Sequence, residues 1–142
     1  IKIDLKGRLQ EIKSGKLKKL VGSNRLVCDG GHNTNSAIAI AKWVKQQNQD
    51  VHLIIGMMQD KDHQGFIKCF KENIKSITLV DIPNQENSIQ KEDFKKKINI
   101  INKKINLGNS IEESIKAMNK YENSICLIIG SLYLIGEVLN LN

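Results

Sequence analysis

The stretch with the most chemically useful spacing is Asp29-Gly30-Gly31-His32-Asn33, which directly follows the apolar run 26–28. A carboxylate at this point can accept hydrogen bonds from ribose hydroxyls or orient a partner. The two glycines let a ligand approach the backbone, and the imidazole of His32 can stack on a nucleotide or hydrogen-bond to it. The alternative is that Asp29 and Asn33 only shape a turn and cap the helix that follows.

Two more polar clusters follow apolar runs. Asp60-Lys61-Asp62 comes after residues 51–56, and Gly130-Ser131 comes after residues 124–129. Lys61 can neutralise a phosphate or a carboxylate, or it can belong to a solvated charged loop. The hydroxyl of Ser131 and free N–H groups beside it can hold a carboxylate, or Ser131 can be a plain helix cap.

All three clusters stand where an apolar strand ends, so the strands must bring them together. The carboxyl ends of parallel strands lie along one edge of a sheet, and open α/β sheets bind their ligands there. Neither GxGxxG nor GxxxxGK[ST] occurs in the chain, so it carries no dinucleotide fingerprint and no phosphate-binding P-loop. His52 and His63 are interpreted as strand or surface residues and not as ligands.

The apolar pattern predicts alternating strands and helices in a single domain, residues 1–142. Residues 1–7, 8–13 and 16–21, with a turn at Ser14-Gly15, predict an antiparallel N-terminal hairpin. Further strands are expected at 25–29, 51–56, 76–82, 105–107 and 124–129, with helices at 34–47, 65–73, 89–101, 111–121 and 132–141. This order indicates a Rossmann-like three-layer α/β domain, with a mostly parallel sheet of about six strands, an antiparallel N-terminal edge and helices on both faces.

Composition narrows the function classes. The net charge is +7, but only Arg8 and Arg25 among the 22 basic residues are arginines, and aromatic residues make up 4% of the chain. Both features argue against specific nucleic-acid binding. No apolar run is long enough to span a membrane and no secretory signal is visible, so we expect a cytoplasmic protein. The chain opens at Ile1 in mid-pattern, which suggests a piece of a longer protein.

The three cysteines, Cys28, Cys69 and Cys126, are widely spaced and lie in apolar surroundings. An odd number without metal-ligand spacing indicates reduced, buried thiols, and no metal site is predicted. A catalytic thiol at Cys28, assisted by His32, is the alternative.

Four blocks of sequence together resemble the C-terminal domain of folylpolyglutamate synthase/dihydrofolate synthase, of the Mur ligase family. The blocks are Gly7-Arg8-Leu9-Gln10, the Asp29–Asn33 stretch, Gly56-Met57 with Asp60-Lys61-Asp62, and Gly130-Ser131-Leu132-Tyr133-Leu134-Ile135-Gly136-Glu137. They occur in the family's order and span nearly the whole chain.

The resemblance implies an ATP-dependent amide ligase that adds L-glutamate to dihydropteroate or folates through an acyl phosphate. By motif, Arg8, Asp29 and His32 resemble the family's nucleotide-binding residues. His32 and Lys61 resemble its catalytic residues. Ser131 and Asp62 resemble its glutamate-binding residues. ATP and Mg²⁺ are the implied cofactors, held mainly by an N-terminal ATPase domain that this chain lacks. The domain is then expected to be monomeric and inactive without that ATPase domain.

Three features depart from the family pattern. Thr34 stands where the family usually has proline, no arginine occurs near Asn87, and the segment between Arg8 and Asp29 is longer and richer in lysine. Two other interpretations therefore stay open. One is a stand-alone or remnant module that binds a nucleotide or a partner weakly without catalysis, and the other is a Mur-type ligase that acts on a cell-wall precursor.

Overall fold

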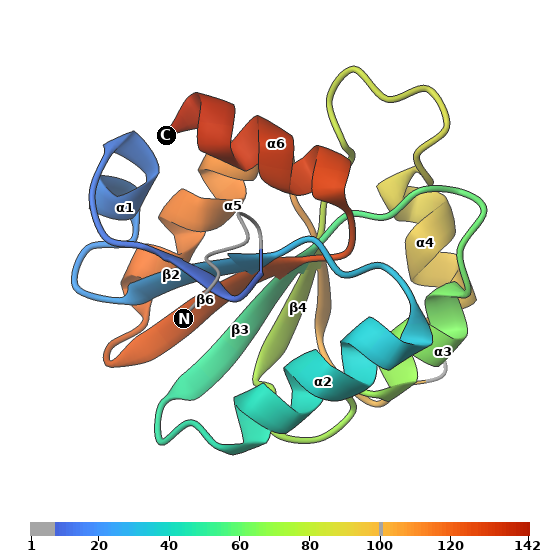
Figure 1. Ribbon diagram of the computed structural model, residues 1–142, viewed down its shortest axis with the longest axis horizontal. Coiled ribbons are helices and arrows are strands. Elements are labelled where there is room, and N and C mark those ends of the chain that lie inside the picture. Colours follow the sequence, from blue (N-terminus) through green and yellow to red (C-terminus); the bar gives the residue numbers. More distant parts are fainter. Residues whose placement is uncertain (1–7, 100) are drawn as a thin grey trace, which may run out of the picture.

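A six-stranded mixed sheet forms the middle layer of the computed structural model, which describes residues 8–99 and 101–142 (Figure 1). The strand order is β1-β2-β6-β3-β4-β5, with β1 antiparallel to β2 and every other neighbouring pair parallel. The strands are β1 (Gln10–Ile12), β2 (Arg25–Asp29), β3 (Asp50–Ile55), β4 (Ser76–Leu79), β5 (Ile105–Leu107) and β6 (Ser124–Ile129). The predicted three-layer α/β fold with a mostly parallel sheet is confirmed.

Helices cover both faces of this sheet. They are α1 (Lys16–Leu20), α2 (Thr34–Lys45), α3 (His63–Lys68), α4 (Lys91–Lys97), α5 (Ile111–Ala117), the 3₁₀ turn η1 (Met118–Lys120) and α6 (Leu132–Leu141). Side chains of one strand alternate between faces, so Leu53 and Ile55 pack with α2, α3 and α4, whereas Ile54 packs with α1, α5 and α6. Both faces of the central strands are therefore buried, as expected for parallel strands.

The predicted strand at residues 16–21 is wrong, because this segment forms helix α1. Leu17, Leu20 and Val21 have the i, i+3, i+4 spacing of one helix face, and they pack against the α5 and α6 layer. The start of α1 is held by the C-terminal residue, since the backbone N–H of Leu17 donates to Oδ1 of Asn142 at 2.9 Å. Figure 1 shows the C-terminus beside α1.

The N-terminal hairpin is also corrected, because β1 pairs with β2 and not with residues 16–21. Glu11 lies opposite Val27, and the antiparallel edge of the sheet thus forms between segments separated by a helix. The Arg25 guanidinium donates to the Glu11 carboxylate at 2.8 Å and holds the two strands together at their outer edge. The part of the hairpin predicted for residues 1–7 lies outside the described residues.

Several predicted elements begin or end at other residues in the structure. The strand predicted at 76–82 ends at Leu79, and the helix predicted at 89–101 spans Lys91–Lys97. The helix predicted at 65–73 is α3, which begins two residues earlier because the Asp62 side chain caps it. All helices in residues 8–99 and 101–142 are too short or too polar to cross a membrane.

Candidate functional site

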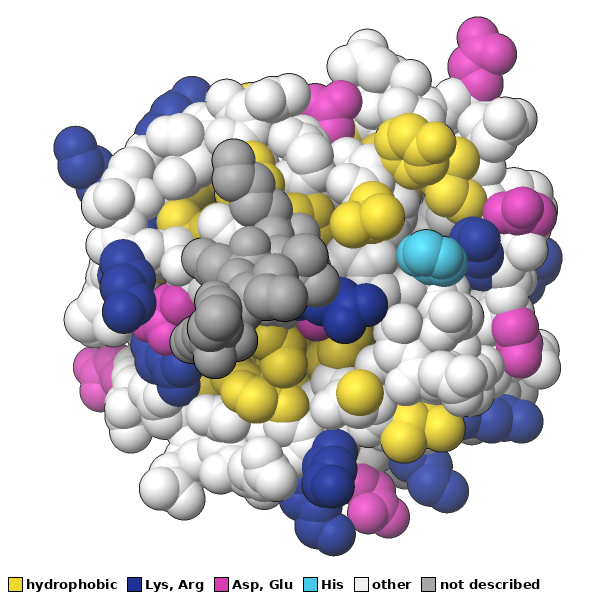
Figure 2. All heavy atoms as spheres, viewed as in Figure 1, with side chains coloured by type: hydrophobic (Ala, Val, Ile, Leu, Met, Phe, Trp, Pro, Cys, Tyr) yellow, Lys and Arg dark blue, Asp and Glu magenta, His cyan; other side chains and the backbone are white. Residues whose placement is uncertain are grey.

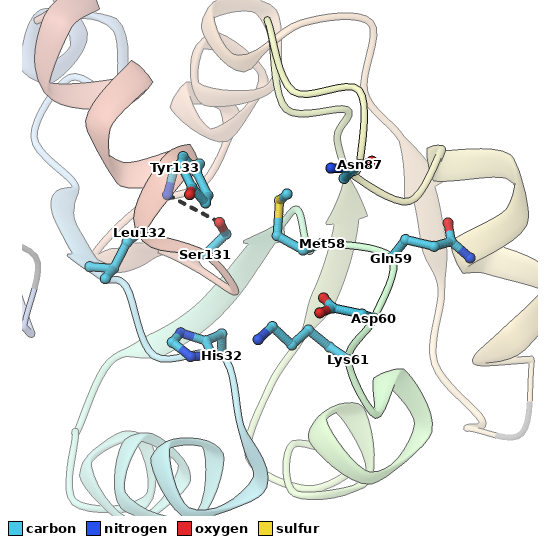
Figure 3. Close-up of a pocket in the computed structure, with 9 residues that line it drawn as sticks. All are labelled: His32, Met58, Gln59, Asp60, Lys61, Asn87, Ser131, Leu132 and Tyr133. Carbon is cyan, nitrogen blue, oxygen red and sulfur yellow. Dashed lines mark hydrogen bonds between the residues drawn. The ribbon is translucent and has the colours of Figure 1, made fainter.

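A groove of about 560 Å³ opens at the carboxyl ends of β2, β3 and β6 (Figure 3). It is lined by His32, Met58, Gln59, Asp60, Lys61, Asn87, Ser131, Leu132 and Tyr133. The three polar clusters of the sequence thus each contribute to one groove, as the shared strand edge predicts. Of the predicted site residues, His32, Lys61 and Ser131 line the groove, whereas Arg8, Asp29 and Asp62 do not.

The turn after β2 is built around the Asp29 carboxylate. Its oxygens accept hydrogen bonds from the backbone N–H groups of Leu9 at 3.0 Å and Gly31 at 2.7 Å. Asp29 is 8% exposed, so it lies under the turn. These contacts are those of a turn-shaping residue, and they also hold the start of β1 against the end of β2.

The close approach of α6 to this turn favours a glycine at position 30. A Cβ added to Gly30 would contact the side chain of Leu132, the first residue of α6. Asn33 then caps α2, since its Oδ1 accepts from the Ser36 N–H at 2.9 Å. His32 lies between Gly30 and Asn33 in the chain. It is half-buried, and its Nδ1 is 3.3 Å from the Gly30 carbonyl oxygen.

The loop 57–62 forms the wall opposite His32 and carries Lys61. Among the described residues that line the groove, Lys61 is the one cation, and in Figure 3 its ammonium end points toward the His32 ring. A cation facing an imidazole across an open groove can neutralise an anion placed between them.

Backbone hydrogen bonds fix this loop to the segment 85–89. The Gln59 N–H donates to the Asn87 carbonyl at 2.7 Å, and the Ile89 N–H donates to the Met57 carbonyl at 3.0 Å. Asn87 thereby reaches the groove, and no sequence motif marked it as a site residue.

His63 holds the same loop from inside the protein. It is buried, packs against the Phe94 ring, and places Nε2 2.9 Å from the Met58 carbonyl oxygen. Because a carbonyl oxygen only accepts, Nε2 carries the proton. Burial lowers the pKa of His63 below its usual value. The capping signal of Asp62, the residue before it, could have identified His63 as the first residue of a helix.

Asp62 acts as the N-cap of α3. Its Oδ1 accepts from the Gly65 N–H at 3.0 Å, and its side chain lies outside the groove. The cap fixes the point where the loop 57–62 ends and α3 begins.

Ser131 caps α6 at the groove wall. It is 2% exposed, and its Oγ accepts from the Tyr133 N–H at 3.1 Å. The N-terminal end of α6, where backbone N–H groups lack partners within the helix, therefore faces the groove and favours an anion there. Leu132 and Tyr133, which follow, are 59% and 55% exposed.

Replacing Ser131 by alanine is expected to lower the free energy of unfolding by about 1 kcal/mol, because α6 loses its capping oxygen. Chemical denaturation measures this loss. Ser110→Ala is the matched control, since Ser110 Oγ caps α5 at 3.0 Å from the Glu113 nitrogen, away from the groove. Similar losses in both variants, with carboxylate binding in the groove weakened only in Ser131→Ala, would assign both roles to Ser131. Equal carboxylate binding in the two variants would show that Ser131 caps α6 and does not bind the carboxylate.

The structure removes Cys28 as a candidate nucleophile. Cys28 is fully buried in the layer that packs against α1 and α6. Burial and the neighbouring Asp29 carboxylate raise the pKa of the Cys28 thiol to about 12, so the reactive thiolate is scarce at neutral pH. The three cysteines are free thiols, as predicted, although Cys69 is only partly buried.

His52 is likewise remote from the groove. It is buried in β3, its Nδ1 lies 2.7 Å from the Ser76 hydroxyl, and its ring stacks on Tyr121 at 3.7 Å. In the part of the chain that the structure describes, no three His, Cys, Asp or Glu side chains gather closely enough to hold a metal ion.

A family model decides the classification of this α/β domain. The model of the dihydrofolate synthetase C-terminal domain matches residues 13–141. The chain belongs to this family. None of the curated protein sequences compared matches the chain.

Solved structures of this family's enzymes have the same fold. Mycobacterium tuberculosis folylpolyglutamate synthase complexed with ADP superposes with a TM-score of 0.83 at 14% identity, over 98% of this chain and 32% of that one. E. coli FolC in complex with DHPP and ADP has a TM-score of 0.74 at 20% identity, over 96% and 31%. The Yersinia pestis bifunctional enzyme complexed with AMPPNP and Mn ion has a TM-score of 0.76 at 19% identity, over 96% and 31%. This chain therefore spans about a third of the length of these solved structures.

Proposed function

We propose that this chain is the C-terminal domain of an ATP-dependent ligase that adds L-glutamate to dihydropteroate or a folate. In that reaction the γ-phosphoryl group of ATP passes to the substrate carboxylate, ADP leaves, and the amine of glutamate displaces phosphate from the acyl phosphate. Two observations support the proposal: the family membership of residues 13–141, and a groove at the carboxyl edge of the sheet.

The observation that carries the mechanism is the arrangement of Lys61, His32 and the start of α6 around one groove. Negative charge develops on the transferring phosphoryl group, and Lys61 is the cation placed to stabilise it. His32 faces the same space and would orient the phosphate by a hydrogen bond. The N-terminal end of α6, with Ser131, suits a carboxylate such as that of the incoming glutamate.

The residues outside the groove are assigned supporting roles in the same proposal. Arg8 is exposed and precedes Leu9, whose N–H is bound by Asp29. Arg8 and Asp29 would therefore contact a nucleotide only at the rim of the groove. Asp62 would act on glutamate only through the loop that it ends. Magnesium would be held mainly by the ATPase domain, which the ligase needs in addition to this one.

A non-catalytic module that binds a nucleotide or a partner weakly is the second candidate, because the phosphate-binding GxxxxGK[ST] motif does not occur in this sequence. The coding region upstream of Ile1 separates the two. A GxxxxGK[ST] motif there supports the ligase, and its absence supports the module.

Lys61→Met is expected to lower kcat/KM for glutamate ligation by about 100-fold, the usual cost of removing one preorganised charge from a transferring group. His32→Ala is expected to act in the same direction. The assay follows ADP release coupled to glutamate addition by the enzyme that contains this domain. Lys116→Met, on the exposed face of α5, is the matched control. Unchanged kinetics in both groove variants would remove the groove from the reaction.

A further inference from the structure

Three adjoining hollows cover the outer surface of α2 and α3 and reach the amino ends of β3, β4 and β5. Their volumes are about 620, 360 and 400 Å³. Each hollow shares lining residues with the other two: Lys68, Lys71 and Glu72 join the first and second, Lys45 and Asn73 the second and third, and Lys103 the first and third. They form one continuous surface at the opposite edge of the sheet from the candidate site.

Lysines dominate this surface, which we call the basic face: Lys42, Lys45, Lys68, Lys71, Lys75 and Lys103. The acids that line it are Glu72 and Asp50. The ion pairs formed by the described residues involve none of the six lysines. Figure 2 shows basic side chains along the lower rim of the molecule, over α2 and α3.

Helix ends explain only half of this charge. Lys42, Lys45 and Lys68 stand in the last turns of α2 and α3, where cations offset the helix dipole. Lys71, Lys75 and Lys103 lie in loops, where no helix end calls for a cation. Six unpaired like charges around connected hollows attract an anionic partner.

We propose that the basic face is a docking surface for an acidic segment of a partner polypeptide. This interaction goes beyond the proposed ligase function, because the basic face does not include any residue of the groove. A partner bound there would leave the carboxyl edge of the sheet free.

The lining residues favour a polypeptide over other polyanions. Asn73 and Asn102 line the hollows and carry amides, which can hydrogen-bond to a peptide backbone. Ile38 lines the second hollow and is 55% exposed, so one large apolar residue of the segment can pack on it.

Nucleic acid and membrane fit the basic face less well. The described lining residues include no aromatic side chain, whereas single-stranded nucleic acid is bound by stacking on aromatics. Duplex readout needs an element that protrudes into a groove, and a bilayer presents a flat surface. A hollowed surface instead accepts an extended segment.

The test uses a labelled peptide of about ten glutamates around one leucine, titrated into the protein at low salt and followed by fluorescence anisotropy. Lys45→Glu/Lys68→Glu/Lys71→Glu is expected to weaken peptide binding by about tenfold or more, because attractions at three exposed residues of the basic face become repulsions. Raising the salt from about 50 to about 200 mM is expected to weaken wild-type binding as well.

The matched control Lys13→Glu/Lys19→Glu/Lys116→Glu makes the same change of net charge at exposed residues outside the basic face, and it is expected to change the affinity by less than about twofold. Circular dichroism checks that both triple variants fold. Equal losses in the two variants, no peptide binding, or tighter binding of oligo-dT or phosphatidylserine vesicles would each overturn the proposal. Ligation assays of the same variants test the groove separately, because neither triple substitution touches it.

Discussion

Replacing Gly130 by alanine is expected to lower the free energy of unfolding by about 3 kcal/mol or more. Gly130 joins β6 to α6 with a φ of +118°, in the region that side-chain-bearing residues rarely adopt. An added Cβ would also contact the Gly56 carbonyl oxygen, which belongs to the neighbouring strand end and cannot swing away. The turn must therefore open, or the ends of β3 and β6 must separate.

Urea denaturation monitored by circular dichroism measures this loss, and α6 supplies the control. Gly136 lies within α6, and a Cβ added there meets no atom within 4 Å. Gly136→Ala is therefore expected to stabilise the protein by about 0.5–1 kcal/mol, because alanine restricts the unfolded chain and favours the helix. A Gly130→Ala protein as stable as Gly136→Ala would contradict the backbone geometry described for this turn.

The same geometry links stability to the groove. Gly130 sets the direction in which α6 leaves the sheet, and so places Ser131 and the helix N-terminus in the groove wall. If Gly130→Ala folds, carboxylate binding is expected to fall more than in Ser131→Ala, because the whole helix end moves.

The central strands of the sheet are predictable because short apolar runs indicate strands that are buried on both faces. Residues 51–56 and 124–129 are apolar apart from His52, Gly56 and Ser124, and such a short, nearly continuous apolar run is typical of a strand covered on both faces. The segment 16–21 is ambiguous, because Lys16-Leu17-Lys18 alternates as a strand does, whereas Leu17, Leu20 and Val21 share one face of a helix. The partner of β1 is set by tertiary packing, which local periodicity does not encode.

In the candidate site, too, some residues could be predicted from the sequence and others could not. His32, Lys61 and Ser131 were brought together by a topological rule, since each follows a parallel strand. Asn87 and Tyr133 enter the groove through loop and helix geometry, for which their residue types gave no signal. Asp29 and Asp62 are bound by backbone N–H groups of their own turns, and a turn-shaping acid has the same sequence signature as a ligand-binding one.

Replacing Asp29 by alanine is expected to destabilise the protein by about 3 kcal/mol. The change removes both acceptors of the Leu9 and Gly31 N–H groups, and hydrogen bonds to a charged acceptor contribute about 1.5–3 kcal/mol each. Chemical denaturation measures the total, and hydrogen exchange of the Leu9 and Gly31 amides shows which contacts open. Asp62→Ala, which removes one exposed cap, is the comparison and is expected to lose about 1 kcal/mol.

Asp29→Asn separates the structural role of Asp29 from its proposed contact with the nucleotide. The amide keeps one oxygen acceptor, so this variant is expected to retain more stability than Asp29→Ala. Nucleotide binding that falls in proportion to stability across the two variants would make Asp29 a residue that shapes the turn and places His32. Nucleotide binding that is lost in Asp29→Asn while stability is largely kept would make the carboxylate itself a ligand. The first outcome is the one we expect, because Asp29 is nearly buried and both of its oxygens already accept backbone hydrogen bonds.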